Sequence, residues 1–506
     1  MRILFMLAHA GLFRNFDSTL RLLVERGHDV HVSFDSDRYP SEAFNELVAQ
    51  HDNLTTGRSP EIRSDRWAVL GRHVRAGSDY VRFLDPRYAN APKLRDRGRR
   101  QVPIWLRGML GNDGRARALD RRLRAIEASL PPSDVLVEFV RANRPDLLVV
   151  SPLFGFPVQL EALRAAAVLG VPNCHMVASW DNLTNKGLMR TCPGTVVVWN
   201  EAQLQEAVEL HGVPRDRVTV TGAQNFDEWF ARSPTTGYAD FTARLGLRPD
   251  RRYLLYLGSS SFIAPDEALY FAEWLTRVRT HPALAEVGVL VRPHPQNARQ
   301  WERADLRDAP QLAIHPPPGA APQQTGRADW SREDFYDSMY HATAVVGVNT
   351  TAMIESGILG RSVHTLLASQ FRHTQGGTLH FEHLRSAGGG LLHVATDWDE
   401  HFASLADSLE RGGEPDPRSR RFVEAFVRPH GIDRPATPLV VDALERAAER
   451  VPDAALSNVG ASKRLLLEPL ALVAAGTERW TRGPKRKRGR RLRRTVKRAR
   501  RLLSHA

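Results

Sequence analysis

Short runs of apolar residues alternate along most of the chain with segments in which apolar residues recur every three or four positions. Runs such as 3–7, 147–150 and 253–257 have the length of buried strands, while 16–25 has the spacing of an amphipathic helix. Apolar runs without alternation are typical of parallel strands that helices cover on both faces. The pattern therefore predicts an α/β protein built from parallel strand–helix–strand units.

The same pattern divides the chain into parts. With 506 residues the chain is long enough for two or three domains. The pattern weakens where Arg becomes frequent, and it breaks at a stretch rich in Pro, Gly and charge. We expect a first domain at 1–232, which contains an Arg-rich insertion at 63–124. A linker at 233–252 leads to a second domain at 253–420. Helices at 421–480 that could cross back to the first domain come next, and a basic tail follows at 481–506.

Two predicted strands of the second domain end in residues that suit an anion. One passes into Arg292-Pro293-His294-Pro295, and the other passes into Asn349-Thr350-Thr351. Ligands of open α/β sheets bind at the carboxyl ends of the strands, and small hydroxyl residues at a helix start bind anions. Arg292, His294, Asn349, Thr350 and Thr351 are therefore candidates for contacting one phosphorylated ligand. The alternative is that Arg292 pairs with a structural carboxylate and that the threonines only cap a helix.

The net charge of +13 comes from the end of the chain. From Arg482 onward there are thirteen Lys or Arg and no Asp or Glu, so the rest of the chain has a formal charge of zero. A neutral body argues against a nucleic-acid-binding protein, for which the tail is the only support. The two cysteines, Cys174 and Cys192, allow no disulfide framework and favour a reducing compartment. No apolar stretch reaches the length of a transmembrane helix.

The basic tail has an apolar stripe. Leu492, Val496, Ala499 and Leu503 recur at helical spacing among the basic residues, so 482–503 predicts an amphipathic helix that folds on an anionic membrane surface. A flexible solubilising tail and an RNA-binding tail are the alternatives.

The Trp-bearing apolar segment 102–110 of the insertion leaves two interpretations open. It is either a membrane-facing or acceptor-facing patch, or a pair of packing helices with solvated Arg faces.

Four stretches carry a resemblance to a known family. They are the opening with the His9 loop and Arg26-Gly27-His28-Asp29-Val30, the segment 213–227, Arg292-Pro293-His294-Pro295, and the segment 349–360. Over residues 1–440 the chain resembles GT-B glycosyltransferases of bacterial surface-polysaccharide synthesis and the related CDP-glycerol glycerophosphotransferase-like proteins. The first two stretches are also similar to sugar-nucleotide 2-epimerases.

The resemblance implies two Rossmann-like domains whose parallel sheets face a cleft. It implies a nucleotide-sugar donor of the UDP or CDP type on the second domain, a glycan or lipid-linked acceptor on the first, and no metal or other cofactor. A polyol-phosphate transferase of the CDP-glycerol type and a 2-epimerase are the alternative activities. For a transferase with a lipid-linked acceptor we expect a cytoplasmic protein, peripheral at the inner face of the plasma membrane.

The remaining candidate residues follow from the resemblance and from the chemistry of transfer. A base must deprotonate the acceptor hydroxyl, and His9 or Asp181 would do so, although Ala8 stands where the family usually has Gly. Glu355 would bind the donor ribose. Gly258, Ser259 and Ser260 form a turn at a strand end that could hold a phosphate. His373 and Gln375 would line the cleft from the second domain.

Overall fold

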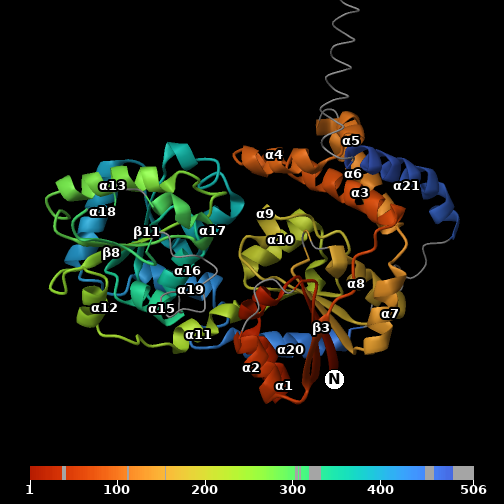
Figure 1. The fold of residues 1–506 in the computed structure, drawn as a ribbon, viewed down its shortest axis with the longest axis horizontal. Helices are drawn as coiled ribbons and strands as arrows, with labels where there is room; N and C mark the ends of the chain where they lie inside the picture. Colours follow the sequence, from red (N-terminus) through yellow and green to blue (C-terminus); the bar gives the residue numbers. More distant parts are fainter. Residues whose placement is uncertain are drawn as a thin grey trace, which may run out of the picture.

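The molecule consists of two α/β domains side by side, with a helical cap above the first (Figure 1). This computed structural model describes the chain except for residues 37–41, 111–112, 154, 156, 303–305, 307–308, 318–331, 451–460 and 483–506. Every strand pair in both sheets is parallel. The predicted fold class, two Rossmann-like parallel sheets in an α/β protein, is confirmed.

The first domain has a seven-stranded sheet in the order β3-β2-β1-β4-β5-β6-β7. Its central strands are apolar on both faces because helices cover both sides, so that Phe5, for example, is fully buried between Val32 and Val149. The strands are β1 (Arg2–Leu7), β2 (Asp29–Phe34), β3 (Leu54–Arg58), β4 (Leu147–Ser151), β5 (Asn173–Met176), β6 (Thr195–Val198) and β7 (Val218–Val220). The helices are η1 (Ala10–Asn15), which is a 3-10 helix, α1 (Asp17–Glu25), α2 (Glu42–Gln50), α7 (Asp134–Asn143), α8 (Pro157–Leu169), α9 (Asn182–Asn185), α10 (Glu201–His211) and α11 (Asp227–Ala231).

The second domain has a six-stranded sheet in the order β10-β9-β8-β11-β12-β13. Its core lies around β8, whose residues are all buried. The strands are β8 (Tyr253–Leu257), β9 (Gly288–Arg292), β10 (Leu312–Ile314), β11 (Ala344–Gly347), β12 (Ser362–Leu366) and β13 (Leu392–Ala395). The helices are α12 (Tyr238–Arg244), α13 (Glu267–Thr280), α15 (Arg332–Tyr340), α16 (Ala352–Ile358), α17 (Leu379–Ser386), α18 (Trp398–Glu410) and α19 (Pro417–Phe426).

One helix near the end of the chain packs on the first domain. Helix α20 (Ala436–Ala448) contacts α1, and its Val440, Val441 and Leu444 are fully buried in the core that also contains Phe5. The carboxylate of Asp227 accepts hydrogen bonds from the backbone N–H groups of Ala436 and Thr437, at 3.0 and 2.7 Å. The end of the first domain thus caps the start of α20.

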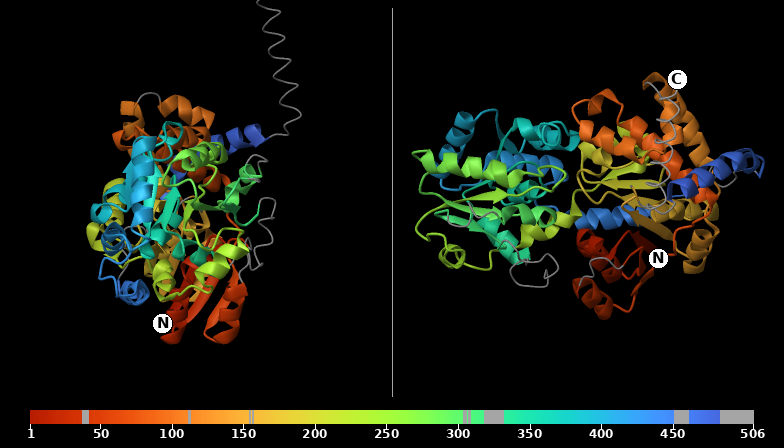
Figure 2. Two further views of the ribbon diagram at one scale, coloured as in Figure 1. Left: turned by 90° about the vertical axis from the view of Figure 1, so that its left-hand side faces the viewer. Right: turned by 45° about the horizontal axis from the view of Figure 1, so that its top comes forward.

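The Arg-rich insertion forms a helical cap on the first domain. It contains α3 (Arg66–Arg82), α4 (Pro92–Gln101), α5 (Ile104–Leu110) and α6 (Asp113–Ala128), and α21 (Ala461–Arg482) packs on α3. We refer to these five helices as the cap. Its own core includes Val74, Leu106 and Leu123, together with Ala471 from α21. The cap and α1 lie at opposite ends of the first domain in Figures 1 and 2. Among the described helices, none is long and apolar enough to cross a bilayer.

Candidate functional site

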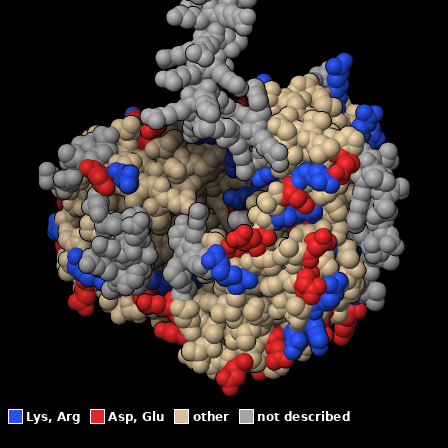
Figure 3. Space-filling model, turned by 45° about the vertical axis from the view of Figure 1, so that its right-hand side comes forward, with Lys and Arg blue, Asp and Glu red and all other residues tan. Residues whose placement is uncertain are grey.

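The carboxyl ends of the two sheets meet between the domains. Figure 3 shows a hollow there, with Lys and Arg side chains along one of its walls. The first domain contributes η1, which follows β1, and the loop after β5. The second domain contributes the loops after β8, β9, β11 and β12. In open α/β sheets these loops form the ligand site.

The loops after β5 and β11 touch across this boundary. Trp180 is buried, and its indole Nε1–H donates to the hydroxyl of Thr351 at 3.0 Å. The Trp180 ring also packs edge-on against His380, with ring centroids 4.7 Å apart. Thr351 stands before the first residue of α16, but its side chain caps no backbone N–H of that helix. Its hydroxyl hydrogen therefore remains available to donate to a ligand.

A buried histidine in α17 joins α9 and the loop after β11 at the same place. Nδ1 of His380 lies 2.9 Å from the side-chain amide of Asn185 in the first domain, and Nε2 lies 3.2 Å from Nδ2 of Asn349. Burial lowers the pKa of His380 to about 4, so the ring is neutral and one nitrogen must accept. Asn349 Nδ2 also donates to the carbonyl of Thr374. A neutral ring accepts at one nitrogen only, so His380 Nε2 accepts from Asn349. Its Nδ1–H then donates to Asn185 only if the Asn185 amide is turned so that its oxygen, and not the nitrogen placed there, faces the ring.

The charge of Arg14, in η1 of the first domain, affects two titratable groups of the second domain. Its positive charge acts both on His294, after β9, and on Glu355 in α16. Charges on a protein surface influence one another within about 10 Å, so Arg14 lies near both of these side chains. Arg14 is exposed and forms no ion pair with any residue that the structure describes.

The pKa values of Glu355 and His294 are both shifted toward the neutral form of the side chain. Burial raises the pKa of Glu355 to about 7, against the opposing charges of Arg14 and Arg332. Burial, followed by the charge of Arg14, lowers the pKa of His294. The Nδ1 atom of His294 accepts from the backbone N–H of Gln296 at 3.1 Å. A neutral His294 therefore carries its proton on Nε2 and offers a hydrogen-bond donor instead of a charge.

Arg292 already has a partner. Its Nη1 lies 2.6 Å from Oδ2 of Asp334, and both side chains are about 5% exposed or less. Although burial alone would raise the pKa of Asp334, hydrogen bonds and charge from His315 and Arg292 hold it at about 2. This is the pairing that the structural alternative for Arg292 predicted. A direct contact between Arg292 and a ligand stays a prediction.

The turn after β8 is built into the domain. A Cβ on Gly258 would lie 2.9 Å from the backbone nitrogen of His294, so only glycine fits between the ends of β8 and β9. Ser259 is fully buried, and its N–H donates to the carboxyl of Glu267 at 2.6 Å. Burial raises the pKa of Glu267 to about 8. Ser260 is half-buried in the same turn. These contacts fix the turn, and a phosphate contact of Ser259 or Ser260 stays a prediction.

The two candidate bases follow β1 and β5, which are separated by β4 in the first sheet. His9 is half-buried between β1 and η1. Asp181 follows β5, and its carboxylate accepts from the hydroxyl of Ser179 at 2.9 Å and pairs with Lys186 at 3.4 Å. Burial alone would raise the pKa of Asp181, but the positive charge of Lys186 leads the interactions that lower it. Asp181 is therefore held as a carboxylate beside the Trp180 contact.

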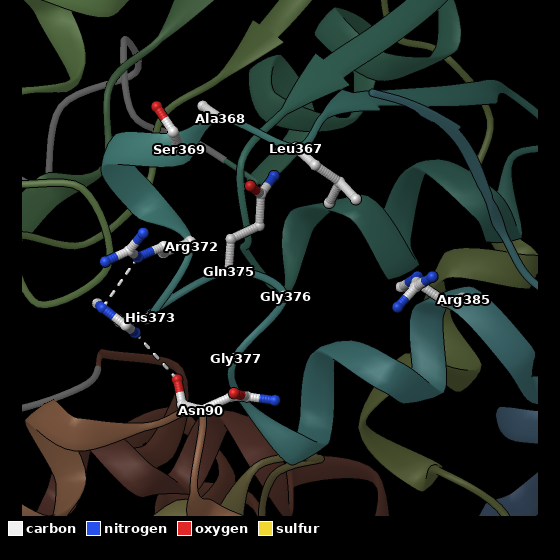
Figure 4. A pocket seen from close by; sticks show the side chains of 10 residues that line it. All are labelled: Asn90, Leu367, Ala368, Ser369, Arg372, His373, Gln375, Gly376, Gly377 and Arg385. Atoms are coloured by element: carbon white, nitrogen blue, oxygen red, sulfur yellow. Dashed lines mark hydrogen bonds between the residues drawn. The ribbon is translucent and has the colours of Figure 1, made fainter. Parts of the chain in front are cut away.

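His373 and Gln375 line a pocket of about 460 Å³ between β12 and α17 (Figure 4). Nε of Arg372 donates to Nε2 of His373, whose Nδ1–H donates to the carbonyl of Asn90, between α3 and α4 of the cap. Gln375 is buried, and its Nε2 donates to Val348, Thr365 and Leu366. The other residues that line the pocket are Leu367, Ala368, Ser369, Gly376, Gly377 and Arg385.

The cap supports the loop that follows Asp181. The guanidinium of Arg82, in α3, is buried and donates to the carbonyls of Leu183, Thr184, Lys186 and Gly187. An arginine with five donors in a planar fork can hold such a loop in one shape. The insertion therefore fixes the position of one candidate base, although its sequence matches none of the motifs.

The structure thus brings His294, Glu355 and Thr351 to the same boundary as the loops of His9 and Asp181, while Arg292 and Gln375 serve internal contacts. Sequence reasoning missed Arg14 and the Trp180–Thr351 contact. Arg14 had a signal, since it lies in the loop–helix segment that begins at His9. Trp180 and Thr351 are 171 residues apart, and no local pattern connects them.

Comparisons with known proteins identify the arrangement. No protein-family model matches the sequence, and none of the curated proteins compared with it is significantly similar. Solved structures do match over nearly the whole chain. A glycosyltransferase from Rickettsia africae has a TM-score of 0.52 at 10% identity, covering 88% of this chain and 98% of its own. A UDP-GlcNAc 2-epimerase from Methanocaldococcus jannaschii has a TM-score of 0.50 at 11% identity, covering 88% and 100%. S. aureus MnaA with UDP has a TM-score of 0.50 at 11% identity, covering 89% and 98%. These likenesses are of fold, and the chain has the two-domain GT-B fold.

Proposed function

We propose that the protein is a glycosyltransferase that binds a nucleoside diphosphate sugar between its two domains. The observation that carries the proposal is the position of Arg14, a guanidinium without a carboxylate partner among the described residues, opposite His294 and Glu355. A diphosphate needs compensating charge and hydrogen-bond donors in a partly desolvated place. Arg14, the Nε2–H of His294 and the hydroxyls of Thr350 and Thr351 supply these.

Transfer would use the same groups. Negative charge develops on the diphosphate as the bond to the sugar breaks, and fixed donors stabilise that charge. Glu355 would accept hydrogen bonds from the ribose. His9 or Asp181, on the opposite domain, would take the proton of an acceptor hydroxyl. The charge comes from Arg14 in this scheme, because the guanidinium of Arg292 is occupied by Asp334.

The second candidate is a sugar-nucleotide 2-epimerase, the activity named for the Methanocaldococcus jannaschii structure. It would use the same diphosphate site without an acceptor. A polyol-phosphate transferase with a CDP-glycerol donor is the third candidate. Incubation with UDP-GlcNAc or CDP-glycerol, followed by NMR with and without candidate glycan acceptors, separates the three. Transfer that requires an acceptor supports the proposal, and formation of a sugar epimer without an acceptor refutes it.

The donor site is tested by calorimetry with UDP and CDP in the presence of a chelator. Arg14→Ala should raise the dissociation constant by about tenfold or more, because a charge-assisted contact contributes about 1.5–3 kcal/mol. Arg420→Ala is the matched control, since Arg420 is exposed and pairs with Glu424 on α19. Unchanged affinity of the Arg14 variant would remove Arg14 from the site.

We also propose that the basic segment 482–503 brings the protein to the inner face of the plasma membrane, where a lipid-linked acceptor would lie. From residue 483 this segment lies outside the described residues, and its thirteen basic residues support the proposal. Co-sedimentation with anionic vesicles should be weaker for a chain that ends at Trp480. Equal partition, or binding of RNA but not vesicles at physiological salt, would refute the membrane role.

A further inference from the structure

The cap has an apolar face that its own packing leaves open. Ile104, Gly108 and Met109 are spaced at i, i+4 and i+5, so they share the outer face of α5, while the half-buried Trp105 packs on the cap core and its indole N–H donates to Nδ1 of His73. Ile104 is 73% exposed and Met109 is 56% exposed. The opposite face of α5 already supplies the cap core through Leu106 and Leu110, each 1% exposed. Folding of the cap therefore does not require the exposed side chains of Ile104 and Met109.

Exposed apolar side chains concentrate on the cap. Nine large hydrophobic residues stand out as exposed in the described part of the chain, and four of them are on α5 and α21. On α21 the exposed pair is Leu472 (57%) and Val473 (55%). Figure 1 places α5 at the outer end of the cap, away from the sheets. An exposed apolar pair, Ile104 and Met109, on a projecting helix indicates an interaction surface and not the normal scatter of apolar residues.

The charge beside this face identifies the partner. Residues 92–124, which form α4, α5 and most of α6, contain eleven Lys or Arg and three Asp or Glu, a net charge of +8. Because residues 1–481 sum to zero, the rest of that span has a net charge of −8. On α4 and α6 the exposed charged residues are Lys93, Arg95, Asp96, Arg99, Arg100, Arg115, Arg117, Arg121, Arg122 and Arg124.

We propose that the outer face of α5, with the arginines of α4 and α6 around it, docks on an anionic phospholipid bilayer. Short apolar side chains would enter the headgroup region while guanidinium groups contact lipid phosphates. A second copy of this chain is a poor occupant, since two surfaces of charge +8 repel each other. A nucleic acid would satisfy the arginines but leave the apolar face in water.

This surface is distinct from the basic tail and from the proposed reaction. Helix α21 is held on α3 by Ala471 and Ala474 and by the Arg66–Glu468 ion pair. The tail begins where α21 ends, so the tail and the face of α5 are carried by the same part of the fold. The two would act together at one membrane, with the cap defining how the molecule is oriented.

The experiment compares full-length variants on vesicles of phosphatidylglycerol and phosphatidylcholine. Ile104→Gln with Met109→Gln should weaken partition onto anionic vesicles by roughly tenfold, because two exposed apolar side chains leave the interface. Leu269→Gln is the matched control, since Leu269 is 54% exposed on α13 in the other domain, and it should bind like the parent. Circular dichroism confirms that the variants are folded.

A direct readout uses Met109→Cys carrying a polarity-sensitive dye. Its emission should shift to the blue on anionic vesicles, and the same dye on Leu269→Cys should not shift. The proposal would be overturned if the double variant partitioned like the parent, or if the dye emission shifted without vesicles when only the protein concentration was raised.

UDP binding by the parent protein is measured separately, without vesicles. If the parent did not bind UDP, the proposed function would be refuted and the docking surface would still stand.

Discussion

The two candidate bases differ in how firmly their surroundings hold them. Asp181 is fixed by Ser179 and Lys186, and the charge of Lys186 lowers its pKa, which makes the carboxylate a weak base. His9 lies on the loop after β1, directly before the helix that carries Arg14. We therefore expect His9→Ala to reduce transfer by roughly a hundredfold or more while the affinity for UDP stays within about twofold of the parent.

Asp181→Asn is the matched variant for this test. It removes a charge beside the same boundary and keeps the hydrogen-bonding shape, so it should retain much more activity than His9→Ala. Single-turnover rates and calorimetry on both variants separate chemistry from binding. Loss of UDP binding in His9→Ala with turnover preserved would contradict the assignment and make Asp181 the base.

Glu355 should make stability depend on pH. Its pKa is about 7 in the folded protein and near 4.5 in the unfolded chain. Between these values the unfolded chain loses the proton and the folded protein keeps it, so the contribution of Glu355 to stability is full below pH 4.5 and is lost as pH rises through 7. The melting temperature of Glu355→Gln relative to the parent should therefore increase from pH 5 to pH 7.5 and then level off.

Melting curves at four pH values test this, and Glu382→Gln on α17, an exposed residue paired with Arg385, is the control. Other titrating groups, including Glu267, are common to the parent and the variant and cancel in the difference. If the melting temperatures of the parent and Glu355→Gln differed by the same amount at every pH, Glu355 would have an ordinary pKa in the folded protein.

Single residues show how far sequence reasoning reached. Arg292, His294 and Thr351 were recognisable as residues at strand ends because each follows an apolar run, and strand ends are where ligands bind. Their contacts could not be predicted. The partner of Arg292 is Asp334, 42 positions away, and the partner of Thr351 comes from the other domain. Local pattern determines where a side chain stands in an element, whereas contacts depend on how the elements are packed.

Among the elements, α17 and α9 join the two domains directly. His380 at the start of α17 contacts Asn185 in α9, and His383 on the same helix bonds to Glu206 in α10 at 2.5 Å. His380→Ala would leave the buried amides of Asn185 and Asn349 without one partner each, at a cost of about 1–3 kcal/mol per group. We expect a lower melting temperature and faster hydrogen exchange in α9 and α17.

His380→Gln is the matched control, because an amide can replace both ring nitrogens in part and should recover some of the loss. Hydrogen exchange measured by mass spectrometry locates the effect. Faster exchange confined to α17, with α9 unchanged, would mean that the contact does not hold the domains together.

The elements that the sequence predicted are those with continuous apolar runs. Residues 218–220 and 253–257 are strands as expected, and the helix expected at 157–169 has those bounds. The sequence pattern missed β3, whose Thr55, Thr56 and Arg58 are exposed at the edge of the sheet, and β10, which is three residues long. One interpretation of the Arg-rich region was a pair of packing helices, and the structure has α3, α4, α5 and α6 there. Its arginines obscure the apolar stripe that faces the cap core.

For the molecule as a whole, the chain returns from the second domain to complete the first. Helix α20 supplies Leu444, fully buried in the core of the first domain, although it follows α19 of the second domain. Asp227 holds the crossing point by binding the first N–H groups of α20 and the guanidinium of Arg428. The first domain is therefore incomplete until nearly the last described helix has been made.

Leu444→Ala tests this dependence. Removing a buried leucine side chain costs about 2–5 kcal/mol, and the loss should fall on the first domain, more than two hundred residues earlier in the chain. Hydrogen exchange should become faster in β1 and β2, while β8 and β9 of the second domain keep their protection. Leu269→Ala, on the exposed face of α13, should change neither. Equal loss of protection in both sheets would mean that the two domains unfold as one cooperative unit, and a loss confined to the second domain would contradict the assignment of α20 to the first core.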